Sequence, residues 1–170
     1  MNGAVRRRMS APRVAQLNES DWRVFANLRL RALADTLGTD DPQYRQEMSF
    51  TAAQWRRRLR VHAQFVAAID DHLVGLVGAQ RESVESVYLY SLWVAPPARG
   101  HDLAAVLLTA AVDWARAQHA RMVTLRVSQD NAAARAVYER LGFGVTAAND
   151  KANGRAAGHA DEVTMSLSVG

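Results

Sequence analysis

Short segments in which apolar and polar residues alternate run along the whole chain. Successive side chains of a strand point to opposite faces of a sheet, so this period of two is typical of strands. The longest segment, residues 84–94, is rich in β-branched and aromatic residues and ends at Pro96 and Pro97, which cannot donate to a sheet ladder. The pattern predicts strands at residues 12–18, 64–69, 72–79, 84–94, 122–127, 143–147 and 163–169.

Four other segments carry apolar residues at every third or fourth position, the spacing of a helix with one buried face. Thr51 stands before the second as an N-cap, Asp130 stands before the fourth, and Gly142 follows the fourth. Residues 39–49 show no period and are predicted to be a loop, and the Gly-, Ala- and Asn-rich segment 150–161 a mobile one. The predicted helices are residues 22–37, 51–59, 103–114 and 131–140.

The order of these elements is βαα–ββ–β–α–β–α–ββ, which predicts an α/β or α+β fold around one mixed sheet. No internal repeat and no linker divides the order, so residues 11–170 are expected to form a single domain. Residues 1–10 contain Arg6, Arg7 and Arg8 without an apolar segment after them, and we expect a disordered basic arm rather than a signal peptide.

Composition narrows the classes of function. The chain has 170 residues, 49% of them hydrophobic and 22% charged, the balance of an ordinary globular protein. No apolar run approaches the roughly 20 residues that span a bilayer, so no membrane association is expected. The absence of cysteine excludes disulfides, thiolate metal sites and a cysteine nucleophile, and a cytoplasmic location is the default expectation.

The net charge of +4 raises the question of nucleic-acid binding. The positive residues are nearly all arginines, they are scattered, and no recognition helix or aromatic-basic platform accompanies them, so no nucleic-acid partner is expected. A patch that attracts a polyphosphate is a milder interpretation of the same charge. The five histidines lack metal-ligand spacing, and no Gly-x-Ser-x-Gly motif marks a serine hydrolase, so neither a metal nor that triad is expected.

The segment 92–108 carries the most specific chemistry. A strand stops at prolines, a tight turn with Arg99 and Gly100 follows, and a helix begins at once. Several unpaired backbone N–H groups and the positive end of the helix would then point at one place, which favours phosphate binding. Arg99 can add a charge-assisted contact, and Gly100 lets the backbone approach closely.

Three motifs in order resemble the GCN5-related N-acetyltransferases (the GNAT family). The sequence Arg99-Gly-His-Asp-Leu-Ala104 is similar to the family signature Arg/Gln-x-x-Gly-x-Gly/Ala. The segment 125–143 resembles the family's strand, Asn-x-x-Ala and a helix that ends Tyr-x-x-x-Gly-Phe, and residues 28–35 resemble its first helix. The resemblance implies a mixed, mostly antiparallel sheet of about seven strands with about four helices, and acetyl transfer from acetyl-CoA to an amine of a small molecule or protein.

The resemblance also implies roles for individual residues. The main chain at Leu92 and Val94 would hold the pantetheine arm, residues 99–104 the pyrophosphate, and Tyr138 would protonate the departing thiolate as general acid. Packing between helix and sheet is the plainer alternative for Tyr138, and a helix-start role for Asn131. The implied coenzyme-binding residues are Leu92, Trp93, Val94, Arg99, Gly100, His101, Asp102, Leu103, Ala104, Asn131, Arg135 and Tyr138.

Asp102 departs from the signature, because the family has glycine there. A carboxylate about 5 Å from a phosphate costs roughly 3 kcal/mol at an effective dielectric near 20. Asp102 could instead cap the helix with its side chain. The alternative to an enzyme is therefore a degenerate acetyltransferase fold that acts as a non-catalytic binding or regulatory module.

The general base and the acceptor are the least defined parts. Glu85, and after it Glu82, lies near the strand expected to line the acceptor site, although an exposed carboxylate at a strand edge is the commoner role. The first two helices and the segments 35–49 and 150–161 are expected to build that site. The acyl chain length stays open, and a homodimer is expected only because dimers are common in the family. Four carboxylates could recognise a cationic amine, although solvated loop acids are the more frequent explanation for them: Asp35, Asp40, Asp41 and Glu47.

Overall fold

The computed structural model describes residues 10–148 and 161–170. In these ranges a seven-stranded sheet has the order β1-β2-β3-β4-β5-β7-β6. Its neighbours are antiparallel except for β4 and β5, which are parallel, so the expected mixed, mostly antiparallel sheet is confirmed. The strands are β1 (Arg13–Gln16), β2 (Ala63–Ile69), β3 (His72–Arg81), β4 (Ser86–Val94), β5 (Met122–Ser128), β6 (Gly144–Ala148) and β7 (Glu162–Ser168).

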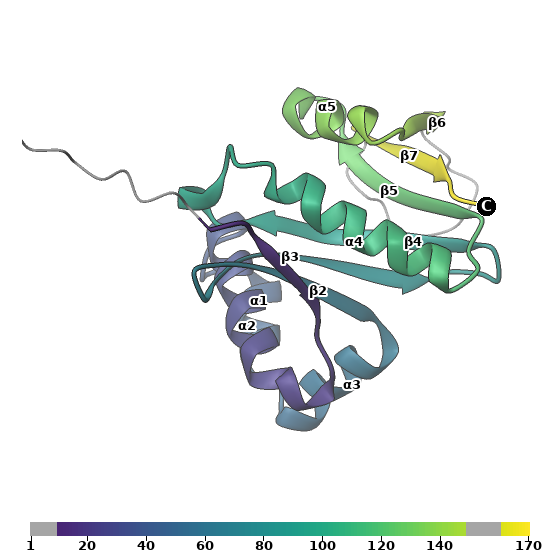
Figure 1. The fold of residues 1–170 in the computed structure, drawn as a ribbon. Helices are drawn as coiled ribbons and strands as arrows, with labels where there is room; N and C mark the ends of the chain where they lie inside the picture. Colours follow the sequence, from purple (N-terminus) through teal and green to yellow (C-terminus); the bar gives the residue numbers. More distant parts are fainter. Residues whose placement is uncertain (1–9, 149–160) are drawn as a thin grey trace, which may run out of the picture.

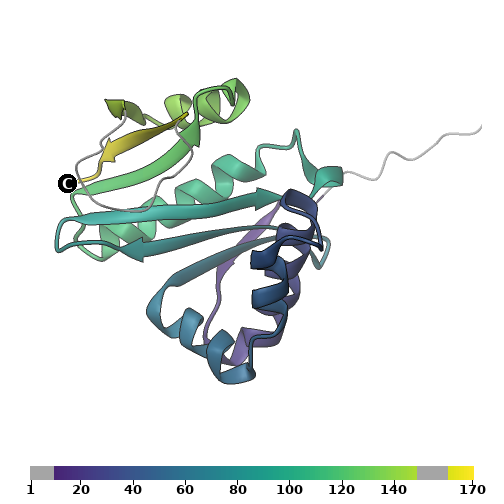
Figure 2. The same ribbon diagram turned by 180° about the vertical axis from the view of Figure 1, so that it is seen from behind.

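Helices cover both faces of the sheet (Figures 1 and 2). Helix α4 joins the parallel strands β4 and β5. It packs with α5 over one buried cluster, in which Leu107 and Met165 are fully enclosed. Helices α1 and α3 cover a second cluster that includes Phe25 and Trp55, whose rings meet edge to face. The α-helices of the described ranges are α1 (Trp22–Thr36), α2 (Pro42–Met48), α3 (Ala52–Val61), α4 (Leu103–Ala117) and α5 (Ala132–Arg140).

Two predictions about local structure are wrong. The expected loop at residues 39–49 contains α2, for which Asp41 is the N-cap and Pro42 the first residue. Seven residues are too few to show a helical period, and the buried member of this helix is the charged Glu47 rather than an apolar residue. The cap of α5 is Asn131, whose side chain accepts the amide of Ala134, rather than Asp130.

The disordered arm was predicted for residues 1–10 and the mobile loop for residues 150–161, and all of these except Ser10 and Asp161 lie outside the described residues.

Candidate functional site

The strands β4 and β5 pair only over their first residues. In the described structure the ladder joins Ser86–Tyr88 to Met122–Thr124 and does not continue beyond them. The strands diverge from that point, which leaves backbone groups on their facing edges without a ladder partner. A cavity of about 210 Å³ opens there, with Leu89, Leu125 and Tyr138 among its walls. We call it the strand cavity.

A β-bulge interrupts β4 beside the strand cavity. One residue of β3, Val77, lies opposite two residues of β4, Ser91 and Leu92. Ser91 has a φ of 56°, which is strained for a residue with a side chain. Bulges of this kind redirect backbone and side-chain groups next to functional sites. Here Ser91 and Leu92 line the strand cavity and also a second cavity on the opposite side of the strand.

Tyr138 enters the strand cavity from α5. Its ring is buried against Phe143, and burial raises the pKa of its phenol. No hydrogen bond to another described residue accompanies that burial. The hydroxyl therefore stays protonated at neutral pH and is free to donate to a ligand in the cavity.

The turn between the prolines and α4 has an open backbone. Gly100 has a φ of 86°, and a Cβ built there would meet no atom within 4 Å. Asp102 has a φ of 58° and holds the N-cap position of α4, but its side chain accepts no backbone N–H. The hypothesis that this carboxylate caps the helix is thus wrong. It lies instead 4.0 Å from the guanidinium of Arg140 at the end of α5.

The first amides of α4 are left free by this arrangement. The first backbone hydrogen bond of α4 runs from the amide of Val106 to the carbonyl oxygen of Asp102, at 3.1 Å. The amides of residues 103–105 precede that bond and have no side-chain cap. Amides of this kind, together with the positive end of a helix, favour an anion, so the prediction of a phosphate site here stays open to test.

Arg99 makes contacts on the other side of the turn. Its Nε donates to the carbonyl oxygen of Val94 at 3.0 Å, and its Nη2 donates to the carboxylate of Asp35 in α1 at 2.9 Å. The same Asp35 oxygen accepts the indole N–H of Trp93, which is buried beneath α1. Asp35 thus ties the turn to the helix that covers the opposite face of the sheet.

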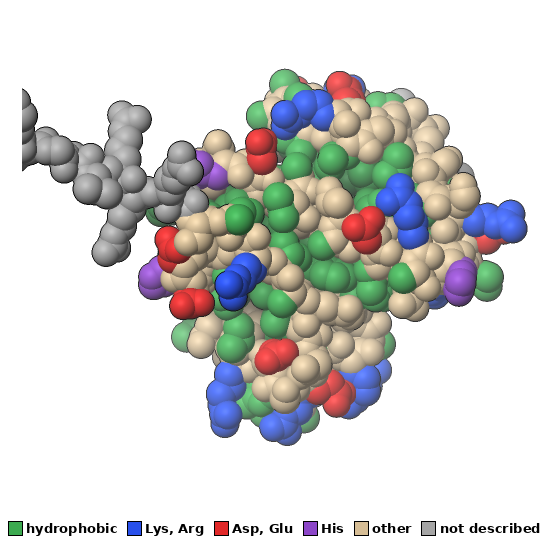
Figure 3. All heavy atoms as spheres, viewed as in Figure 1, with side chains coloured by type: hydrophobic (Ala, Val, Ile, Leu, Met, Phe, Trp, Pro, Cys, Tyr) green, Lys and Arg blue, Asp and Glu red, His purple; other side chains and the backbone are tan. Residues whose placement is uncertain are grey.

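A groove of about 420 Å³ runs between α4 and α5, and its walls include Val106, Val137 and Arg140. Hydrophobic side chains gather over this part of the surface (Figure 3). Asp102 and Ala105 also belong to its walls, so the groove adjoins the N-terminal end of α4. Elsewhere on α5, the Nε of Arg135 is buried without a hydrogen-bond partner in the described structure. Asn131 is exposed, and its side-chain oxygen accepts the amide that caps α5.

Three more of the residues expected to bind the coenzyme lie in the turn before α4 or in its first turn. His101 is exposed in the turn, whereas Leu103 is buried in the core under α4. Ala104 lies in the first turn of α4 and is half-buried.

The second cavity has a volume of about 190 Å³ and lies between α1, α2 and β4. Its charged wall residue is Arg29, and Leu33, Gln43 and Trp93 are among the other walls. We call it the helix cavity. It shares two wall residues, Ser91 and Leu92 of the β4 bulge, with the strand cavity.

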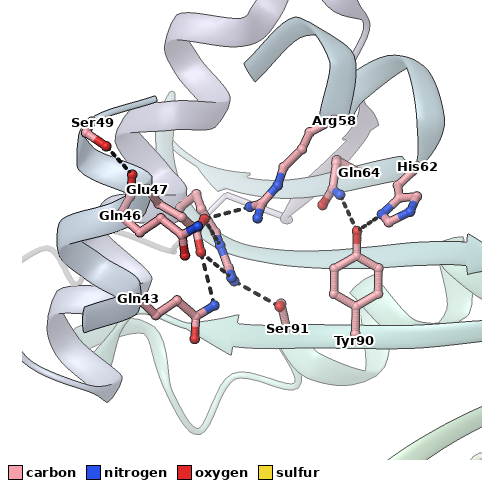
Figure 4. Close-up of polar contacts among 10 residues, drawn as sticks. Gln43, Gln46, Glu47, Ser49, Arg58, His62, Gln64, Tyr90 and Ser91 are labelled. Atoms are coloured by element: carbon pink, nitrogen blue, oxygen red, sulfur yellow. Dashed lines mark hydrogen bonds and ion pairs between the residues drawn. The ribbon is translucent and has the colours of Figure 1, made fainter. Parts of the chain in front are cut away.

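A buried ion-pair network stands behind the helix cavity (Figure 4). Arg29 contacts Glu47 through Nε at 3.1 Å and Nη2 at 3.3 Å, and it donates from Nη1 to the Ser91 hydroxyl at 2.9 Å. Arg58 contacts Glu47 at 2.6 Å, and Gln43 donates to it at 3.0 Å. Burial acts to raise the pKa of Glu47, but these donors outweigh it and hold the pKa below its ordinary value, so Glu47 is ionised.

A second polar cluster adjoins this network. The hydroxyl of Tyr90 lies 2.6 Å from Nδ1 of His62 and accepts from the side chain of Gln64 at 2.8 Å (Figure 4). The ring of Tyr90 lies over Gly78, where a Cβ would approach it to 2.5 Å. Burial raises the pKa of Tyr90, and burial and then the charge of Arg58 lower that of His62.

Neither polar cluster was found by sequence reasoning. A weak signal existed, since Arg29 stands on the apolar face of the first predicted helix, between Phe25 and Ala32. A charged residue at such a position must be paired when it is buried.

Glu85 is not brought to the strand cavity. It precedes β4 at the end where β4 and β5 are paired, and its exposed carboxylate lies 4.0 Å from Arg121. The first cavity residue of β4 is Leu89, four positions on, or roughly 13 Å at about 3.3 Å per residue. Glu82 precedes β4 as well, and its amide donates to the Ser86 carbonyl at 3.0 Å.

The described parts of the chain contain no group of three or more His, Cys, Asp or Glu residues placed to hold a metal ion. None of their helices combines the length and the apolar character that a membrane-spanning helix needs.

Comparison with solved structures identifies the fold. An acetyltransferase of the GNAT family from Streptococcus pneumoniae is 18% identical, with a TM-score of 0.72 over 94% of this chain and 100% of its own. The PaiA N-acetyltransferase of Thermoplasma acidophilum, solved in complex with coenzyme A, is 14% identical, with a TM-score of 0.69 over 94% and 99%. YncA of Salmonella typhimurium, solved with its cofactor acetyl-CoA, is 19% identical, with a TM-score of 0.68 over 94% of both chains.

Comparison of the sequence gives the family. No curated protein matches it significantly. The model of the acetyltransferase (GNAT) family matches residues 22–143, well over half of the chain. That range holds α1 to α5 and both cavities. The chain therefore belongs to the acetyltransferase (GNAT) family.

Proposed function

We propose that this protein transfers an acetyl group from acetyl-CoA to a primary amine. The observation that carries the proposal is that two cavities share the β4 bulge as a wall, and that the hydroxyl of Tyr138 lies in one of them. A thioester in the strand cavity and an amine in the helix cavity would face each other across Ser91 and Leu92. Family membership and the coenzyme in the PaiA structure support the same assignment.

The residues present fit coenzyme A. The free amides of residues 103–105 and the open backbone at Gly100 suit the pyrophosphate. Arg135 on α5, whose Nε has no hydrogen-bond partner in the described structure, is a further candidate donor. The carboxylate of Asp102 acts against the phosphates, and Arg140, 4.0 Å away, offsets part of its charge. Arg99 can turn from Asp35 to a phosphate, since both side chains are partly exposed.

The proposed acetyl transfer needs few catalytic groups from the protein. Acetyl-CoA supplies the activated acetyl group; the amine nitrogen bonds to its carbonyl carbon, the carbon–sulfur bond breaks, and the amine loses one proton. Backbone N–H groups of the bulge, where β4 lacks a ladder partner, stabilise the oxyanion. Tyr138 donates its proton to the sulfur as general acid and regains one from the amine through water. Glu47 is not the base, because it is buried and its oxygens accept from two arginines and Gln43, which lower its pKa and so its affinity for a proton.

Calorimetric titration with acetyl-CoA tests the cofactor site. We expect binding at micromolar strength, weakened about tenfold by Arg99→Ala through the loss of a charge-assisted contact. Asp35→Asn is the matched control, because it breaks the same 2.9 Å ion pair but leaves the cation in place. Its affinity should equal or exceed that of the parent protein. Absence of binding at millimolar acetyl-CoA would contradict the proposed function.

Substitutions at Asp102 test the cost of its charge. Asp102→Asn and Asp102→Gly are both expected to tighten acetyl-CoA binding, by up to about tenfold at low salt and less at high salt. Asparagine tolerates the positive φ of 58° as aspartate does, so agreement between the two variants assigns the effect to charge. The measurement is the dissociation constant at two salt concentrations. A larger effect of glycine alone would assign it to the backbone.

A further inference from the structure

The helix cavity carries an excess of positive charge. Two guanidinium groups, Arg29 and Arg58, share the single carboxylate of Glu47, which leaves one positive charge uncompensated in the network. Glu47 itself is only 1% exposed, so a ligand in the cavity meets Arg29 rather than the carboxylate. An uncompensated charge in a partly desolvated site acts on a ligand more strongly than one in water.

Arg29 has hydrogen-bonding capacity to spare. A guanidinium has five N–H donors, and the described structure uses three of them, two on Glu47 and one on Ser91. The remaining two belong to Nη1 and Nη2, since Nε has a single hydrogen. These contacts, and the burial of the residue to 9% exposure, hold the guanidinium in place before a ligand arrives. A planar cation with free donors is a good partner for a carboxylate.

The acids once expected to recognise a cationic amine are engaged elsewhere. Asp35 accepts from Trp93 and Arg99, and Asp41 caps α2. Asp40 is fully exposed and pairs with Arg45 on the surface, and Glu47 is enclosed by its three donors. None of the four carboxylates lines the helix cavity. The structure therefore offers this cavity a cation and no free acid among the residues described.

We propose that the helix cavity binds an acceptor that carries a carboxylate as well as its amine, and that Arg29 binds this carboxylate. The class of acceptor is a small amino acid: the volume of about 190 Å³ suits a small molecule, and Leu33, Leu37, Leu92 and Trp93 provide apolar walls for a side chain. With its carboxylate on Arg29, the amine can reach the bulge, because Arg29 bonds directly to Ser91 there. This inference rests on the proposed function.

Matched pairs of acceptors test it. Acetylation of leucine and of leucinamide is followed by thiol release from acetyl-CoA, with alanine and alaninamide as a second pair. We expect kcat/KM to favour the acid over the amide about tenfold or more, the value of one charge-assisted hydrogen bond. Because the amide has the less basic amine, N-acetyl-leucine and N-acetyl-leucinamide are compared as inhibitors too, and the acid should again bind about tenfold more tightly.

A variant that changes the charge of the helix cavity's wall shows whether the preference for acids over amides arises in this cavity. Gln43 is exposed on α2 and lines the cavity, so Gln43→Glu adds a carboxylate there, in place of the amide that donates to Glu47, and keeps Arg29. The preference for acids should fall about tenfold. Gln46→Glu makes the same change on the same helix at an exposed position outside the wall, and should leave the preference within about twofold.

The outcomes separate the two proposals. Equal or better use of the amides, or equal effects of the two glutamate variants, overturns the acceptor class while acetyl transfer stands. Binding of acetyl-CoA without acetylation of any amino acid overturns it as well. Failure to bind acetyl-CoA at all overturns the proposed function.

Discussion

Replacement of Tyr138 by phenylalanine is expected to lower kcat by about a hundredfold, with the dissociation constant of acetyl-CoA nearly unchanged. General acids contribute roughly 10²–10⁴-fold, and the substitution removes only the hydroxyl from a ring that stays packed on Phe143. Steady-state thiol release gives kcat, and calorimetry gives the affinity. Tyr44→Phe on α2 removes the same atom outside both cavities and should leave kcat unchanged.

The pH profile adds a second test of this role. Burial raises the pKa of Tyr138 above its ordinary value of 10.0, so the acid form that donates persists to at least that pH. Loss of kcat from deprotonation of Tyr138 should therefore appear only above about pH 10. A Tyr138→Phe enzyme with parental kcat would refute the general-acid role and leave Tyr138 as a packing residue.

Replacement of Glu47 by glutamine is expected to lower the free energy of unfolding by about 3–5 kcal/mol. The variant leaves Arg29 and Arg58 in contact with a neutral group, and breaking a buried pair by removing one partner costs about that much. Urea denaturation measures the change. Asp113→Asn interrupts an exposed i,i+3 pair with Arg116 and should cost less than about 1 kcal/mol.

The contribution of Glu47 should also depend on pH. Its folded pKa lies below the ordinary value of 4.5, so the unfolded chain binds the proton more readily. The stabilisation is present above pH 4.5 and is lost as the pH falls through the folded pKa. The parent protein should therefore lose stability more steeply than Glu47→Gln below pH 4.5. Parallel curves for the two proteins would show that the pair contributes little.

Features that depend on one contiguous segment of the sequence were predicted well. The strand, proline stop, turn and helix of the segment 92–108 appear where the pattern predicts them, because each depends on local backbone chemistry. The wrong predictions concern side chains whose position depends on residues far away in the sequence. The carboxylate of Asp102 turns to Arg140 on another helix rather than capping its own, and α2 is marked by a buried charge instead of an apolar period.

The sequence by itself determined the order of the strands and of every α-helix except α2, the turn between β4 and α4, and the family resemblance, since each of these resides in spacing along the chain. Only the tertiary structure decided what lines the helix cavity. Arg29 and Ser91 are 62 positions apart in sequence, and Arg29 and Glu47 are 18 apart. Their meeting depends on how α1 and α2 pack on β4, and packing of separate elements leaves no periodic trace in either segment. For this reason the acids that looked available to a cationic amine turned out to be occupied, and the cavity presents a cation.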